Sequence, residues 1–163
     1  FVRRASDGGP VMSMTSGALM PVWIFEKIGW FAPEYFIDCV DFEYCLRIRA
    51  AGYLIADARN AVLLHAAGNA EKSKSLFGIQ YRATHYSATR RYYISRNRIA
   101  LYRKYFRIFP GWILQSMYDG LRETVKCFVS EQDRLLKFRS FLLGTWDGFI
   151  GRMGKRNVGS EVH

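Results

Sequence analysis

The sequence has few cysteines and no long apolar run. Its three cysteines, Cys39, Cys45 and Cys127, are odd in number and form no C-x-x-C pair, so neither a disulfide framework nor a zinc ribbon is predicted. No run of about 18 apolar residues occurs, and the opening "FVRRASDGGP" lacks the apolar core of a signal peptide. Membrane spanning and secretion therefore lack support, and a cytoplasmic location is expected.

The chain also lacks an initiator methionine, an internal repeat and any low-complexity segment. The missing methionine suggests a piece of a longer protein, although a processed terminus would look the same. Acidic residues are in the minority, because 24 lysines and arginines stand against 14 acidic residues and give a formal charge of +10. Such a balance favours an anionic partner, for which nucleic acid, anionic lipid and nucleotide-sugar phosphates all qualify.

Half of the 163 residues are apolar, enough for one domain with a real core. Before about residue 70, short apolar runs are broken by glycine and proline. After it, apolar residues recur with helical periodicity, and basic residues occupy the opposite faces of the expected helices. We expect short helices at 22–28 and 40–50, two extended pieces in 52–65 joined by a turn at "ARN", and a loop at 69–80. Two further helical stretches, 85–106 and 110–156, should be separated by Pro110.

The stretch "YFIDCVDFEYCLR" places three carboxylates among apolar residues, where an unpaired charge would cost several kcal/mol. Asp41 falls in the first turn of the expected helix, where the helix dipole favours an anion, so it could be only a cap. Glu43 and Arg47 stand four residues apart in the favourable orientation for an ion pair. A structural salt bridge is therefore one interpretation of these two residues.

Several elements in fixed order support a second interpretation. They are Ser16-Gly17, Ile28-Gly29, Phe36-Ile37-Asp38, Asp41-x-Glu43 with Arg47, Gly52-Tyr53, His65 with Gly68, and the run from Arg90 to Asn97. Over about residues 12 to 106 the sequence resembles the C-terminal half of family-2 inverting glycosyltransferases with the GT-A fold, in particular the bacterial rhamnosyltransferase-like members.

This resemblance implies a catalytic role for the acidic motif. The family's motif has an acidic pair followed by x-Glu and a later Arg; here Val40 replaces the first acid, and Asp41, Glu43 and Arg47 match the rest. The resemblance therefore puts the general base on Asp41, with Glu43 in the catalytic motif and Arg47 as a substrate-binding residue. Because the first acid is missing, whether Asp38 assists stays open.

The turn at Ser16 and Gly17 can mean a tight turn and nothing more. The resemblance instead implies that both residues line the substrate pocket, together with Asp38. His65, which ends an apolar run, is either a hydrogen-bonded structural residue or, by resemblance, a ligand of a divalent metal, Mg²⁺ or Mn²⁺.

The resemblance implies an α/β fold in which residues 1–80 form the C-terminal, acceptor side of a GT-A (Rossmann-like) catalytic domain and residues 81–163 form a basic amphipathic helical tail. The family's nucleotide-binding half and its Asp-x-Asp motif are missing from this sequence. We therefore expect the metal only in a longer enzyme and no activity from this stretch alone.

The implied function is transfer of a sugar, with inversion, from a nucleotide-sugar donor to a saccharide or lipid-linked acceptor in bacterial surface polysaccharide (O-antigen) synthesis. The alternative is a non-catalytic module that binds nucleic acid or a membrane surface, because Arg and Tyr interleave in "RRYYISRNRIALYRKYFR". Two amphipathic helices on an anionic membrane would show the same pattern, as in a peripheral protein of the inner membrane face, and this interpretation is preferred to nucleic acid. Packing in a helical core would also account for most of the aromatic residues.

Overall fold

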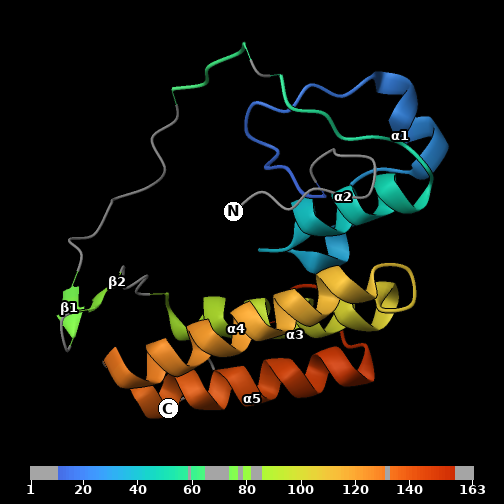
Figure 1. Ribbon diagram of the computed structural model, residues 1–163. Helices are drawn as coiled ribbons and strands as arrows, with labels where there is room; N and C mark the ends of the chain where they lie inside the picture. The colour runs from blue at the N-terminus through green and yellow to red at the C-terminus, as the bar shows by residue number, and fades with distance from the viewer. Residues whose placement is uncertain are drawn as a thin grey trace.

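The computed structural model describes residues 11–58, 60–64, 74–76, 79–81, 86–130 and 133–156, without the side chains of 74–76, 79–81 and 126–130. Its elements are α1 (Val22–Ile28), the short 3₁₀ helix η1 (Pro33–Tyr35), α2 (Val40–Ala50), β1 (Lys74–Leu76), β2 (Ile79–Tyr81), α3 (Ala88–Tyr105), α4 (Pro110–Ser130) and α5 (Arg134–Ile150). The three long helices lie side by side below the N-terminal part (Figure 1). None of the described helices has the length and apolar character needed to cross a membrane.

The two short helices end where glycine permits a positive φ. α1 ends at Gly29 (φ 84°), whose N–H donates to the carbonyl of Phe25 at 2.9 Å. α2 ends at Ala50, and Gly52 follows with φ 85°. Both helices were predicted with these boundaries and are confirmed, because a glycine in this conformation closes a helix at little steric cost.

The second half of the described chain is helical. The side chain of Ser87 caps α3 by accepting from the N–H of Arg90 at 3.2 Å, and α4 begins at Pro110 as predicted. The stretch expected to be helical from 110 to 156 is divided, because Asp133 (φ 58°) starts a new helix, α5, which ends at Gly151.

α3 and α5 pack closely because two glycines face α3. A Cβ atom at Gly144 would overlap the carbonyl oxygen of Tyr92, and one at Gly148 would lie 2.6 Å from the carbonyl oxygen of Arg96. Around this contact, Asp147 is 1% exposed and accepts from the hydroxyl of Tyr92 at 2.6 Å. Small and polar residues therefore form the closest part of this interface, beside Leu143, which packs against Tyr92 and Tyr93.

A second core joins the N-terminal part to the helices. Its buried members come from the chain start, η1, α2, α3 and α4: Val11, Ala32, Tyr35, Cys39, Leu46, Leu101, Tyr105 and Ile113. Phe42 of α2 packs edge-on against Trp112 of α4, with ring centroids 6.4 Å apart. This core fixes the start of α2 over α3 and α4, where the candidate site lies.

The α/β expectation is wrong for the described residues. Where the chain is described between residues 53 and 64 it forms no strand, although the N–H of Ala61 donates to the carbonyl of Ala58 at 3.0 Å where a turn was predicted. The strands that are described, β1 and β2, pair only with each other as an antiparallel ribbon, which begins in the loop predicted at 69–80 and ends one residue beyond it. The apolar runs find no neighbouring strand among the described residues, and a sheet requires one.

Replacing Gly144 by alanine should lower the free energy of unfolding by about 1–3 kcal/mol, because the added methyl group collides with the α3 backbone. Chemical denaturation monitored by circular dichroism measures the change. Gly111→Ala is the matched control: a Cβ there meets nothing within 4 Å, so this change should be neutral or stabilise by up to about 1 kcal/mol. Equal effects of the two changes would contradict the proposed close packing.

Candidate functional site

The turn before α2 has an unusual backbone that α3 holds in place. Three of its residues have positive φ: Phe36 (61°), Asp38 (61°) and Cys39 (63°). The amide group of Asn97, which is fully buried, donates toward the carbonyl oxygens of Tyr35 (2.9 Å), Ile37 (2.7 Å) and Asp38 (2.8 Å). Such conformations are costly for residues other than glycine, and these hydrogen bonds offset the strain.

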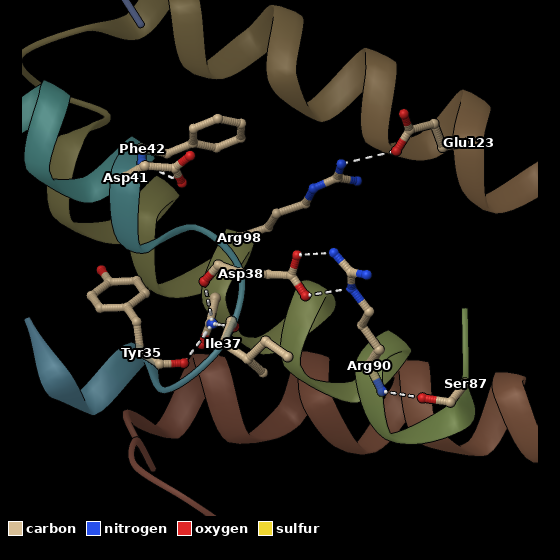
Figure 2. A network of polar contacts seen from close by, with 10 residues as sticks. Tyr35, Ile37, Asp38, Asp41, Phe42, Ser87, Arg90, Arg98 and Glu123 are labelled. Atoms are coloured by element: carbon tan, nitrogen blue, oxygen red, sulfur yellow. Dashed lines mark hydrogen bonds and ion pairs between the residues drawn. The ribbon is translucent and has the colours of Figure 1, made fainter. Parts of the chain in front are cut away.

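The carboxylate of Asp38 is paired with Arg90 of α3. Arg90 donates from Nε at 3.0 Å and from a terminal nitrogen at 2.9 Å, one bond to each oxygen of Asp38 (Figure 2). Its guanidinium also lies over the ring of Tyr86, 4.3 Å from the centroid. This two-point geometry is the strong form of a carboxylate–arginine pair, although both side chains are partly exposed.

Asp41 lies in the first turn of α2, as predicted, and its side chain is half-buried. Its Oδ1 accepts from the N–H of Phe42 at 3.0 Å. No cation within the described part of the chain pairs with this carboxylate, unlike those of Asp38 and Glu43. The Asp41 carboxylate can therefore accept a proton or a hydrogen bond from another molecule.

Glu43 is fully buried and has three partners. Its Oε2 accepts from Arg47 at 2.8 Å, and its Oε1 accepts from Lys104 at 2.8 Å and from the Tyr105 hydroxyl at 2.9 Å. The predicted pair of Glu43 with Arg47 is thus present. Burial and the neighbouring Glu43 carboxylate raise the pKa of Tyr105 above its ordinary value, so its hydroxyl stays a neutral donor.

Arg47, predicted to bind substrate, contacts the protein with both terminal nitrogens. Besides Glu43, they donate to the carbonyl oxygens of Ile28 and Trp30, each at 2.9 Å, and so bind the C-terminal end of α1 to α2. The predicted pocket residues Ser16 and Gly17 form an exposed turn. Gly17 has φ 77°, and a Cβ there would lie 2.6 Å from a methyl group of Leu63.

His65, the predicted metal ligand, lies outside the described residues. Among the residues that are described, no group of three or more His, Cys, Asp or Glu side chains could hold a metal ion. These side chains do not by themselves fit a divalent metal, and no step of the chemistry below is assigned to one.

Two hollows meet at the start of α2. One, of about 640 Å³, is lined by residues of the turn, α2 and α3, among them Asp38, Asp41, Tyr86, Arg90 and Arg98. The other, of about 680 Å³, is lined by the 13–24 segment, α2 and residues 53–63, and includes Gly17 and Tyr44. Asp41 and Thr15 line both hollows. A molecule in either hollow can therefore reach the Asp41 carboxylate.

Comparisons with known proteins relate most of the sequence to a sugar-transferring enzyme. The chain is 30% identical over 144 residues to the dTDP-rhamnosyl transferase RfbF of Shigella flexneri. The match covers 88% of this chain and 47% of the relative, so the chain spans about half the length of the curated relative that it matches. No family model matches the sequence, and no solved structure matches it either. The chain is thus related in sequence to a glycosyltransferase.

The sequence interpretation gave no role to the α3 residues that support the site. Arg90 and Asn97 bound the run that carries part of the resemblance, and Lys104 and Tyr105 follow it. Their partners lie 52 to 62 residues earlier in the chain. In the sequence, the signal that could have indicated these supporting residues is that the run from Arg90 to Asn97 follows the acidic motif in a fixed order.

Tyr105→Phe should lower the free energy of unfolding by about 1.5–3 kcal/mol, because it removes a hydrogen bond to a buried charged group. Tyr118→Phe, at a residue that is 63% exposed, is the matched control and should change it by less than about 0.5 kcal/mol. In a double-mutant cycle, Tyr105→Phe should lower the free energy of unfolding much less when Glu43 is already replaced by glutamine. Strict additivity would show that the two side chains do not interact.

Proposed function

We propose that the protein to which this chain belongs is a family-2 inverting glycosyltransferase in bacterial polysaccharide synthesis. By analogy with the dTDP-rhamnosyl transferase RfbF, the proposed donor is dTDP-rhamnose, and the acceptor is a saccharide or lipid-linked saccharide. The proposal concerns the reaction and these residues, and it assigns no α/β sheet to the described part of the chain.

The observation that carries the proposal is the position of the Asp41 carboxylate between the two hollows. An inverting transfer needs a base within reach of the acceptor hydroxyl while the donor's anomeric carbon lies on the other side of that hydroxyl oxygen. Asp41 is half-buried, stands at a helix N-terminus and has no cationic partner among the described residues. These are the properties expected of a carboxylate that must stay ionised and accept a proton.

The proposed step is a single displacement. The acceptor hydroxyl oxygen attacks the anomeric carbon from the face opposite the nucleotide, while Asp41 takes the hydroxyl proton. The bond from the anomeric carbon to the phosphate oxygen breaks, and its electron pair leaves with the nucleoside diphosphate. The new glycosidic bond therefore has the opposite anomeric configuration to the donor.

The neighbouring charged residues position this base. Glu43 ties α2 to α3 through Lys104 and Tyr105, and with Arg47 it fixes α2 against the end of α1. Asp38, held by Arg90, lines the same hollow as Asp41 and is proposed to contact the acceptor. Fully buried and bound by three donors, Glu43 acts through the fold and not on substrate.

Asp41→Asn should lower turnover by about two to four orders of magnitude, because the amide keeps the shape and removes the basicity. Turnover is measured as release of dTDP from dTDP-rhamnose by the full-length enzyme. Asp119→Asn, the same change at an exposed residue of α4, should leave turnover unchanged. Both variants should melt within a few degrees of the wild type; unchanged turnover in a folded Asp41→Asn variant would refute the assignment.

The stereochemical outcome tests the reaction class separately. The one-bond carbon–proton coupling at C1 of the product, compared with that of the donor, reports the anomeric configuration. Opposite configurations support the single displacement, and retention would exclude it whatever the Asp41 variant does.

A further inference from the structure

α4 and α5 expose their large apolar side chains. Along α4 these are Leu114 (56% exposed), Met117 (47%), Tyr118 (63%), Leu121 (66%) and Val125 (54%). Along α5 they are Leu135 (87%), Phe138 (44%), Leu142 (49%), Trp146 (63%), Phe149 (55%) and Ile150 (50%). In each helix the spacing of three and four residues places them on one side, and the two sets together are called the apolar face. Trp146 is thus an exception to the core packing expected for most of the aromatic residues, whereas Trp112 is half-buried against the core.

Much of the inward side of these two helices is small or polar, although Ile113 and Trp112 of α4 and Leu143 of α5 pack into the cores. α5 turns Ser140, Gly144 and Gly148 toward the protein, and α4 turns Ser116 and Gly120 toward α3. Helices of water-soluble cores normally do the reverse and bury their large apolar residues. Small residues at helix contacts with large apolar residues outside are typical of helices that face lipid.

A crevice continues the apolar face into the protein. It measures about 180 Å³, is mainly apolar, and lies between α3, α4 and α5. Met117 and Leu121 belong both to this crevice and to the apolar face, and Phe141 and Thr145 of α5 form another part of its wall. Arg91, Arg98 and Lys137 also line it. Of these, Arg98 is paired with Glu123, so what the crevice offers to a lipid is mainly its apolar wall.

The charge of the chain is concentrated in this part. Residues 82–156 contain 16 lysines and arginines and 5 acidic residues, whereas the rest contains 8 and 9. The helical part thus has a formal charge of +11 and the remainder −1. Exposed Arg122 on α4 and Arg139 on α5 stand beside the apolar face. Exposed basic residues beside an apolar face complement an anionic lipid surface, where each basic residue contributes about 1 kcal/mol.

We propose that the apolar face of α4 and α5 docks on the surface of an anionic lipid bilayer, with both helices lying along it. Trp146 and Tyr118 are side chains that favour the boundary between headgroups and acyl chains. The proposal is independent of the proposed catalytic activity, because it depends only on the exposed side chains, the crevice and the charge.

The test is co-sedimentation of the protein with vesicles at about 150 mM salt, where weak surface electrostatics are screened. Vesicles of equal parts phosphatidylglycerol and phosphatidylcholine should bind it, and phosphatidylcholine vesicles should bind it far less. Leu121→Gln with Leu142→Gln should weaken binding by more than about tenfold, since two apolar contacts are lost. Leu19→Gln with Leu54→Gln, at exposed leucines away from the apolar face, is the matched control and should bind like the wild type.

Tryptophan fluorescence of the wild-type protein provides a second test, which does not depend on the folding of the Leu121/Leu142 variant. Tryptophan emission should shift to the blue on addition of the anionic vesicles, and Trp146→Phe should remove most of this shift. Asp41→Asn should bind vesicles like the wild type, so that loss of catalysis and loss of docking are separate results.

Three outcomes would overturn the proposal. The first is equal vesicle binding by the wild type and the Leu121/Leu142 variant. The second is a lipid-free dimer in sedimentation equilibrium that this variant abolishes, which would assign the apolar face to a second copy. The third is RNA binding at the same salt that depends on Leu121 and Leu142, which would assign it to nucleic acid.

Discussion

The buried amide of Asn97 holds the turn on which the candidate site depends. Its hydrogen bonds to three carbonyl groups keep Phe36, Asp38 and Cys39 at positive φ, and this turn sets the direction in which α2 starts. The neighbouring Arg96 guanidinium, also fully buried, adds a bond to the carbonyl of Tyr35 at 3.1 Å. Because both donors belong to α3, the helical half of the chain determines where a residue of the N-terminal half is placed.

The three carboxylates of "DCVDFE" have different environments, and this difference accounts for their presence among apolar residues. A buried charge is tolerated only when it is paired, and Glu43 has three donors. Asp38 is bound at both oxygens by Arg90. With its neighbours neutralised in this way, Asp41 is the carboxylate of the three without a described cationic partner. Burial, together with the carboxylates of Asp38 and Asp41, raises the pKa of the neighbouring Cys39 thiol to about 12, so the group stays protonated at neutral pH.

Local signals in the sequence predicted the two short helices and the start of α4, although not the division between α4 and α5. Gly29, Gly52 and Pro110 mark helix boundaries because their backbone preferences act within a few residues, and the pair of Glu43 with Arg47 follows from helical spacing. The strands expected in 52–65 are absent where the chain is described, because an apolar run becomes a strand only where another strand pairs with it.

The pairs of Asp38 with Arg90 and of Glu43 with Lys104 join residues that are 52 and 61 positions apart in the sequence. No local sequence pattern predicts contacts between residues so far apart in the chain. Helical periodicity did predict an apolar side after residue 110, but periodicity does not say whether protein or another surface covers that side.

α4 connects the two proposals physically. Its Glu123 pairs with Arg98 at 2.9 Å, and both line the hollow that contains Asp41. Two residues earlier on the same helix, Leu121 belongs to the apolar face. A helix with its side chains is about 10 Å across, so a bilayer touching Leu121 would lie within about one helix diameter of the hollow's edge. A saccharide on a lipid anchor in that bilayer would then approach Asp41 without leaving the membrane surface. The length of the link between sugar and lipid would thereby decide which acceptors reach the base, a constraint that a freely diffusing saccharide would not meet.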